Sequence, residues 1–143
     1  MHNAVPILSK SLRECQHVLI DRSSRRSQIQ TYKDGIDWLK KGVSLCTFAE
    51  GTRSLDGRIQ KFKKGAFKMA QKMDAPIIPL SIHYAHVVNP KEYVFPKRSS
   101  RSVNGKIVIG KPVYPQGKTD DEVMSEVREE LIKNLPACQR PLE

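Results

Sequence analysis

Residues 43–82 read VSLCTFAEGTRSLDGRIQKFKKGAFKMAQKMDAPIIPLSI, and this stretch is the most informative about the fold. It opens with the short apolar run VSLCTF and closes with the second apolar run APIIPLSI, and both predict β-strands. Between them, four apolar side chains recur at helical spacing on one face: Ala66, Phe67, Ala70 and Met73. A strand, a helix and a second strand in this order are typical of an α/β layer fold.

The rest of the chain extends the same alternation. The pattern predicts further strands over 17–20 and 106–109, helices over 29–41 and about 119–135, and a loop over 83–104. Thr119 and Glu122 predict a capping box at the start of the last helix. We expect an α/β fold in which helices flank a mixed, largely parallel sheet, with ligands at the carboxyl ends of the strands.

Composition and charge limit the possible partners. The chain has 143 residues, enough for one domain or most of one, and a formal net charge of +10. Residues 1–117 contain 21 Lys and Arg against 8 Asp and Glu, so the positive charge is concentrated there. This balance favours anionic partners, which include phosphorylated small molecules, anionic lipid and nucleic acid. No apolar run approaches the roughly 18 residues that a membrane-spanning helix requires.

The end of the run VSLCTF carries the residues best suited to chemistry. There the chain delivers Glu50, Gly51, Thr52 and Arg53 in succession. Gly51 permits a sharp turn that exposes backbone N–H groups to an anion. Arg53 offers a planar guanidinium that can hold two phosphate oxygens at once. Glu50 could orient that guanidinium or accept a hydrogen bond from a substrate hydroxyl.

A basic segment follows this turn, directly before the predicted helix. Its cations are Arg58, Lys61, Lys63 and Lys64. Because a helix N-terminus also attracts anions, the residues between 50 and 64 predict a phosphate site. The alternative is an ordinary turn after a strand, in which Glu50 and Arg53 form a solvated ion pair.

Four ordered segments resemble the glycerolipid acyltransferases, especially the 1-acylglycerol-3-phosphate acyltransferases. FAEGTRS resembles their third motif, Phe-Pro-Glu-Gly-Thr-Arg-Ser, and KFKKGAF and APIIPLSI resemble the segments that follow it. Upstream, VLIDRSSRR at 18–26 resembles the second motif, and VPIL at 5–8 fits the apolar stretch before it. The resemblance covers most of residues 5–113, and it implies that residues 1–143 form one partial, N-terminally truncated acyltransferase domain.

The resemblance also implies roles for individual residues. Glu50, Gly51, Thr52 and Arg53 would bind the glycerol phosphate of the acyl acceptor, with Arg22 and Lys64 also on the substrate, and Pro79 would shape the pocket. Ala49 stands where the family commonly has Pro, which predicts a looser turn and not a lost site.

The family's catalytic His-x-x-x-x-Asp motif is absent from these 143 residues. Five positions after His2, His17, His83 and His86 stand Ile7, Arg22, Val88 and Lys91. The tempting substitute is His17 with Asp21, but in a strand their Cα atoms would lie about 13 Å apart, too far for a hydrogen bond. Asp21 and Arg22 already match the second motif. His83 and His86 could suggest a metal pair, but without further ligands we expect no metal site.

The resemblance therefore implies an enzyme of phospholipid biosynthesis. It would transfer an acyl group from acyl-CoA or acyl-carrier protein, as co-substrate and without a cofactor, to lysophosphatidic acid, giving phosphatidic acid. The alternative is a non-catalytic module that retains the phosphate site and binds anionic lipid, because the chain as written lacks the base. We expect peripheral association with an anionic membrane surface, in the endoplasmic reticulum, a plastid or a bacterial-type membrane. Nucleic acid is disfavoured, because aromatic residues make up only 6% of the chain and no RNA-binding motif is evident.

Overall fold

The computed structural model of the protein describes residues 24–93 and 95–142. The chain divides into two compact units, Met1–Leu45 and Cys46–Glu143, which are described separately. The predicted strand over 17–20, together with His17, Asp21 and Arg22, lies outside the described residues. No helix within the described ranges is both long enough and apolar enough to cross a bilayer.

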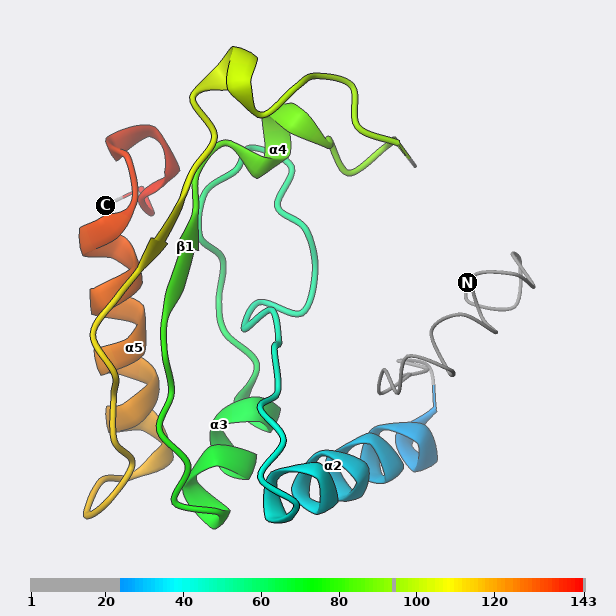
Figure 1. Ribbon diagram of the computed structural model, residues 1–143, viewed down its shortest axis with the longest axis vertical. Coiled ribbons are helices and arrows are strands. Elements are labelled where there is room, and N and C mark those ends of the chain that lie inside the picture. Colours follow the sequence, from blue (N-terminus) through cyan, green and yellow to red (C-terminus); the bar gives the residue numbers. More distant parts are fainter. Residues whose placement is uncertain (1–23, 94, 143) are drawn as a thin grey trace. The chain divides into compact units, whose positions relative to one another are not determined.

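In the first unit, the described structure is dominated by the helix α2, Arg25–Lys40 (Figure 1). Ser24 caps its N-terminus, because the Ser24 side chain accepts a hydrogen bond from the Ser27 backbone N–H at 3.3 Å. The helix ends where Gly42 adopts a φ of +76°, a conformation that glycine adopts without strain. The helix predicted over 29–41 is confirmed, and it begins four residues earlier than its apolar pattern indicated.

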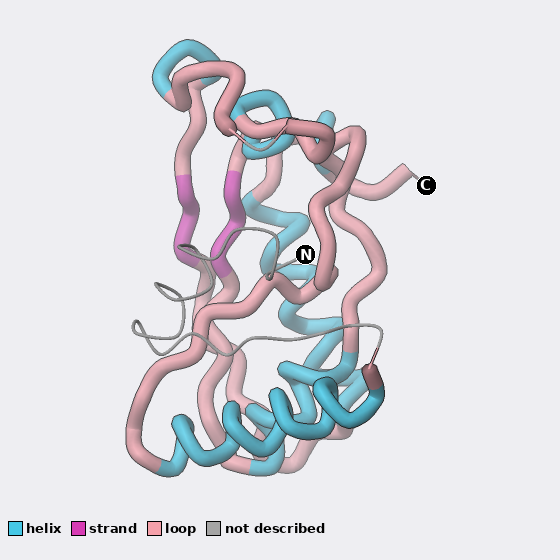
Figure 2. Tube along the Cα trace, turned by 90° about the vertical axis from the view of Figure 1, so that its right-hand side faces the viewer, coloured by secondary structure: helices cyan, strands magenta, loops and turns pink. Residues whose placement is uncertain are grey.

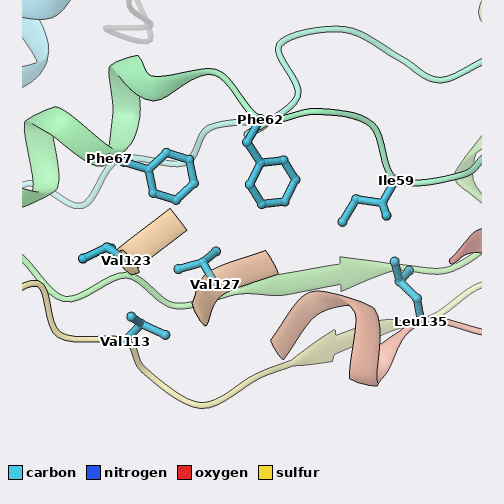
Figure 3. Close-up of a cluster of buried hydrophobic side chains, with 7 residues drawn as sticks. All are labelled: Ile59, Phe62, Phe67, Val113, Val123, Val127 and Leu135. Atoms are coloured by element: carbon cyan, nitrogen blue, oxygen red, sulfur yellow. The ribbon is translucent and has the colours of Figure 1, made fainter. Parts of the chain in front are cut away.

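In the second unit, the helices α3 (Lys64–Lys72) and α5 (Asp120–Asn134) pack around one apolar core. The buried side chains of this core point toward one another in Figure 3: Ile59, Phe62, Phe67, Val113, Val123, Val127 and Leu135. The rings of Phe62 and Phe67 stack with their centroids 5.9 Å apart. The core therefore joins the basic segment before α3 to the last helix of the chain.

The helix α5 has the N-terminus that its sequence predicts. Thr119 accepts a hydrogen bond from the backbone N–H of Glu122 at 3.3 Å, and the Glu122 carboxylate accepts one from the backbone N–H of Thr119 at 2.6 Å. This reciprocal pair satisfies two backbone donors that the first turn of a helix leaves without partners.

The described sheet consists of two antiparallel strands, β1 (Leu80–Ile82) and β2 (Ile107–Ile109), which lie side by side in Figure 2. The expected parallel arrangement is therefore not found in the part of the chain that the structure describes. The reason lies in the connection between the strands. In its described part, residues 83–93 and 95–106, it contains the short helices α4 (Ala85–Val88) and η2 (Arg101–Val103). It returns the chain to the end at which it left, whereas parallel strands require a crossover.

Each face of this small sheet has a different character. Ser81 and Val108 form the middle pair of the register, and the Ser81 hydroxyl donates to the Leu131 carbonyl of α5 at 3.1 Å. The pairs on either side of it project to the other face, where their four aliphatic side chains remain exposed: Leu80, Ile109, Ile82 and Ile107. One face of the sheet thus packs on α5, and the opposite face is apolar and open.

Beyond β2 the ladder shifts by one residue. Leu80 pairs with Ile109, but Ile77 pairs with Val113, so three residues on one side face two on the other. This is a β-bulge over 110–112, where glycine and proline interrupt the strand pattern. The bulge turns Val113 into the core, although Ile109 projects to the open face.

The strand predicted over 43–48 does not form. These residues have no ladder pairing, and Phe48 is 74% exposed. An apolar run becomes a strand only when a neighbouring backbone pairs with it, and the apolar pattern contains no information about that neighbour.

Candidate functional site

The turn after residue 48 is tightly constructed around Gly51. The Gly51 N–H donates to the Phe48 carbonyl at 2.9 Å, and Gly51 has a φ of +71°. The Ala49 carbonyl accepts from the Lys63 N–H at 2.8 Å, which ties the turn to the residue that precedes α3. A Cβ on Gly51 would lie 3.3 Å from the Lys63 Cγ, so both conformation and space favour glycine.

Glu50 is half-buried, and its carboxylate faces backbone. Its Oε2 accepts a hydrogen bond from the Gln60 N–H at 2.8 Å. Burial raises the pKa of Glu50, and the Gln60 N–H and the nearby Arg128 cation oppose that rise. Among the described residues, Glu50 and Arg53 form no ion pair, so the solvated pair considered as an alternative is not what holds this turn.

Arg53 is exposed and reaches a distant segment of the chain. Its Nη1 donates to the carbonyls of Pro90 at 3.4 Å and Tyr93 at 3.5 Å, and its Nη2 donates to the carbonyl of Lys91 at 3.2 Å. These are long contacts, whereas guanidinium–phosphate hydrogen bonds are typically about 2.7–2.9 Å. Thr52 is exposed beside it. The guanidinium is thus positioned by contacts that a stronger anionic acceptor could replace.

The basic segment is partly occupied by other contacts. The Lys64 ammonium lies 2.6 Å from the Asp121 carboxylate in the first turn of α5, and this contact raises the pKa of Lys64. The Arg58 guanidinium donates to the Arg140 carbonyl at 2.8 Å. Lys61 and Lys63 are exposed. Of the four cations predicted around the phosphate site, two are therefore already used to join elements of the fold.

Pro79 is buried in the segment leading to β1, and its carbonyl accepts from the Gly110 N–H at 2.8 Å. Its place is thus fixed by the sheet. The role that the sequence predicts for Pro79, like those of Arg22, Glu50, Gly51, Thr52, Arg53 and Lys64, stays a prediction.

The two downstream histidines have structural surroundings. His83 is buried, and its Nε2 lies 2.7 Å from the Asn134 carbonyl at the end of α5. The His86 ring packs directly against Gly57, where a Cβ would lie only 2.1 Å from the His86 Nδ1. Among the residues that the structure describes, no three His, Cys, Asp or Glu side chains are grouped to hold a metal ion.

The partners that hold this turn are backbone groups, which the sequence does not indicate. Glu50 is held by the backbone of Gln60, and Arg53 by three carbonyls within 90–93. Every residue has a backbone N–H or carbonyl, proline lacking only the N–H, so the residue type gave no signal of these contacts.

Comparisons with known proteins by family model, by sequence and by structure agree with one another. A family model described as "Acyltransferase" matches residues 1–83. The 1-acyl-sn-glycerol-3-phosphate acyltransferase of Limnanthes douglasii is 33% identical over 138 residues, which cover 96% of this chain and 49% of the relative. A relative with the same description in Saccharomyces cerevisiae is 33% identical, with 92% and 44% covered.

Among solved structures, the 1-acyl-sn-glycerophosphate (LPA) acyltransferase PlsC of Thermotoga maritima superimposes with a TM-score of 0.72 at 28% identity. The match covers 91% of this chain and 50% of that one. The chain thus spans about half the length of the relatives that it matches.

Proposed function

Because the chain belongs to the acyltransferase family, we propose that the complete protein makes phosphatidic acid from 1-acylglycerol 3-phosphate. The free hydroxyl of this acceptor attacks the carbonyl of an acyl thioester, acyl-CoA or acyl-carrier protein. A new ester bond forms, the carbon–sulfur bond breaks, and the thiol leaves with the hydroxyl proton. The observation that carries the proposal is the agreement of sequence and fold with acyltransferases of this description. No metal or cofactor is required by this reaction.

The Glu50–Arg53 turn is the proposed binding site for the acceptor's phosphate. Arg53 supplies the cation, Gly51 allows the sharp turn, and the Thr52 hydroxyl is exposed for a further hydrogen bond. The long contacts from Arg53 to carbonyls support this role, because a guanidinium bonds more strongly to a charged phosphate than to a neutral carbonyl. Glu50 holds the turn through Gln60 and so positions its neighbours.

Three further residues are proposed to act on the substrate. Arg22 assists on the acceptor, Lys64 would act on the substrate at the start of α3 only by exchanging its ion pair with Asp121 for the phosphate, and Pro79 shapes the pocket. In this proposal residues 1–143 are one partial acyltransferase domain, and that domain divides into two compact units. The partners are lysophosphatidic acid, the acyl thioester and an anionic membrane surface, with which this chain associates peripherally.

A second function is favoured by one specific observation. No histidine in these 143 residues is followed five positions later by aspartate, so the general base of the family is missing from them. General-base catalysis contributes typically about 10²–10⁴-fold to a rate. A chain with the phosphate site but without the base would bind anionic lipid and not transfer acyl groups.

One experiment separates the two functions. The purified 143-residue chain is incubated with acyl-CoA and lysophosphatidic acid, and both phosphatidic acid formation and acceptor binding are measured. Binding without turnover supports the non-catalytic function for this chain. Turnover at a rate usual for enzymes supports the catalytic function, and its loss in His17→Ala would identify His17 as the base. Absence of both activities would contradict the assignment of the acceptor.

A further inference from the structure

The segment between α4 and η2 has the composition of a membrane interface. In the loop 90–101, which ends at the first residue of η2 and is described except at residue 94, Phe95 is 80% exposed and Tyr93 is 43% exposed. Four cations accompany them against the single carboxylate of Glu92, and all four are exposed: Lys91, Lys97, Arg98 and Arg101. Exposed aromatic rings among cations are typical of segments that lie at the boundary between headgroups and acyl chains.

The loop 90–101 has a fixed base. The N–H groups of Lys97 and Arg98 both donate to the Val88 carbonyl, at 2.7 and 3.3 Å, and the Tyr93 N–H donates to the Pro90 carbonyl at 3.0 Å. Figure 1 shows the chain projecting beyond α4 and returning. The aromatic side chains are therefore presented on a segment whose ends are held together, which lowers the entropy lost when it docks.

The charges of this loop are available to a partner. The Lys97 ammonium lies 4.8 Å from the Tyr93 ring centroid and 3.3 Å from the Tyr93 hydroxyl, which makes one amphipathic pair. Within the described ranges, no carboxylate forms an ion pair with any of the loop's four cations. Their full charge can therefore act on an external anionic surface.

We propose that the loop 90–101 docks this protein on anionic lipid bilayers, with Phe95 and Tyr93 at the level of the headgroups and the four cations on the phosphates. A protein partner fits this surface less well, because the cores of protein interfaces are depleted of lysine, whereas an anionic leaflet attracts each additional cation. The basic segment before α3 is a weaker candidate, because Lys64 is paired with Asp121 and Arg58 with a carbonyl.

This loop also contacts the proposed acceptor site. Arg53 donates to the carbonyls of three loop residues, so a docked loop holds the guanidinium near the headgroups. A lysophospholipid would then meet Arg53 without leaving the interface. This consequence rests on the proposed function, whereas docking itself requires neither acyl donor nor turnover.

Sedimentation with vesicles tests the docking. The full chain is mixed with vesicles of phosphatidylcholine alone or with added phosphatidylserine, at low salt and without any substrate. Each cation near an anionic leaflet contributes about fivefold to binding, so Lys97→Gln/Arg98→Gln should bind about 30-fold more weakly than the parent. The matched control, Lys68→Gln/Lys72→Gln, removes the same charge from α3. An equal loss in both double variants would overturn the assignment to the loop.

A fluorescence measurement tests insertion directly. Phe95→Trp adds one indole to a protein whose only other tryptophan is Trp38, and the spectrum of the parent is subtracted. Transfer to the interface should shift the added emission to shorter wavelength with the phosphatidylserine vesicles. Sedimentation with the vesicles but no shift would overturn the proposed orientation. If docking holds while acyl transfer and acceptor binding both fail, the proposed function fails and this inference stands.

Discussion

The Glu50 carboxylate accepts a hydrogen bond from the backbone N–H of Gln60 at 2.8 Å, ten residues further along the chain. This contact ties the turn to the core, because Ile59, the residue next to Gln60, is buried there. Glu50 therefore holds the base of the turn, and Arg53 is left to reach the loop 90–101.

Glu50→Gln should change how stability depends on pH. Burial raises the pKa of Glu50 above its ordinary value of 4.5. A raised pKa means that the protonated carboxyl stabilises the folded protein. This contribution is fully present below the pKa of Glu50 in the unfolded chain, and it is lost as the pH rises through the pKa of Glu50 in the folded protein. Glutamine has no such loss, so the melting temperature of the variant relative to that of the parent should rise as the pH increases above 4.5. The exposed Glu92→Gln is the control, and an identical pH profile in both variants would contradict this account.

Arg53→Ala should weaken acceptor use by roughly 10- to 150-fold in an active form of the protein, because hydrogen bonds to charged groups contribute about 1.5–3 kcal/mol. Arg53→Lys should restore only part of this, since a point charge cannot reproduce the planar guanidinium. The measurement is the dependence of rate on acceptor concentration, with Lys68→Ala, an exposed lysine of α3, as control. An unchanged kcat/KM in a fully folded Arg53→Ala protein would remove Arg53 from the site.

The same substitution should loosen the loop 90–101. Arg53 and the Tyr93 N–H share the Pro90 carbonyl as acceptor, so loss of the guanidinium frees this turn. Hydrogen exchange at the Tyr93 amide should be faster in Arg53→Ala than in the parent or in Lys68→Ala. Equal exchange in all three would show that Arg53 does not hold the loop.

Gly57→Ala should destabilise the second unit through two additive causes. Gly57 has a φ of +80°, where a side chain costs about 1–2 kcal/mol, and its Cβ would overlap the His86 ring. The thermal or denaturant midpoint should fall accordingly. In a His86→Ala background the overlap is gone, so the same substitution should cost less. An equal cost in both backgrounds would assign the whole effect to backbone conformation.

Thr119→Ala should lower the free energy of unfolding by about 1 kcal/mol, within the range of roughly 0.5–2 observed when N-caps are removed. It deletes the side chain that accepts from the Glu122 N–H. Ser125→Ala, on the exposed surface of the same helix, is the matched control in urea unfolding. A cost for Thr119→Ala no larger than that of the control would mean that the capping box does not stabilise α5.

The three longer helices were predictable from sequence because their signals are local, whereas the short helices α4 and η2 lie within the predicted loop over 83–104. Apolar spacing located α2, α3 and α5, and the pair Thr119 and Glu122 fixed where α5 begins. The sheet was less predictable, because pairing depends on residues distant in sequence. The apolar runs at β1 and β2 indicated strands, but their antiparallel direction depends on the path of the connecting loop.

The site was predictable in its backbone turn and not in the contacts that hold its side chains. Gly51 was expected to turn the chain sharply, and it does so with a positive φ. An ion pair between Glu50 and Arg53 was the alternative to a phosphate site, but each side chain is held by backbone groups instead. Such partners follow only from the folded path of the chain.

The β-bulge over 110–112 also determines where the chain can change length. Insertion or deletion of one residue there would exchange the inward-facing and outward-facing positions of the residues between β2 and α5. Val113 would then turn out of the core. The same change within the exposed loop 90–101 would leave that alternation intact. Alignments of this chain with its relatives should therefore tolerate gaps in the loop, and a gap at the bulge should coincide with compensating changes at the core position of Val113.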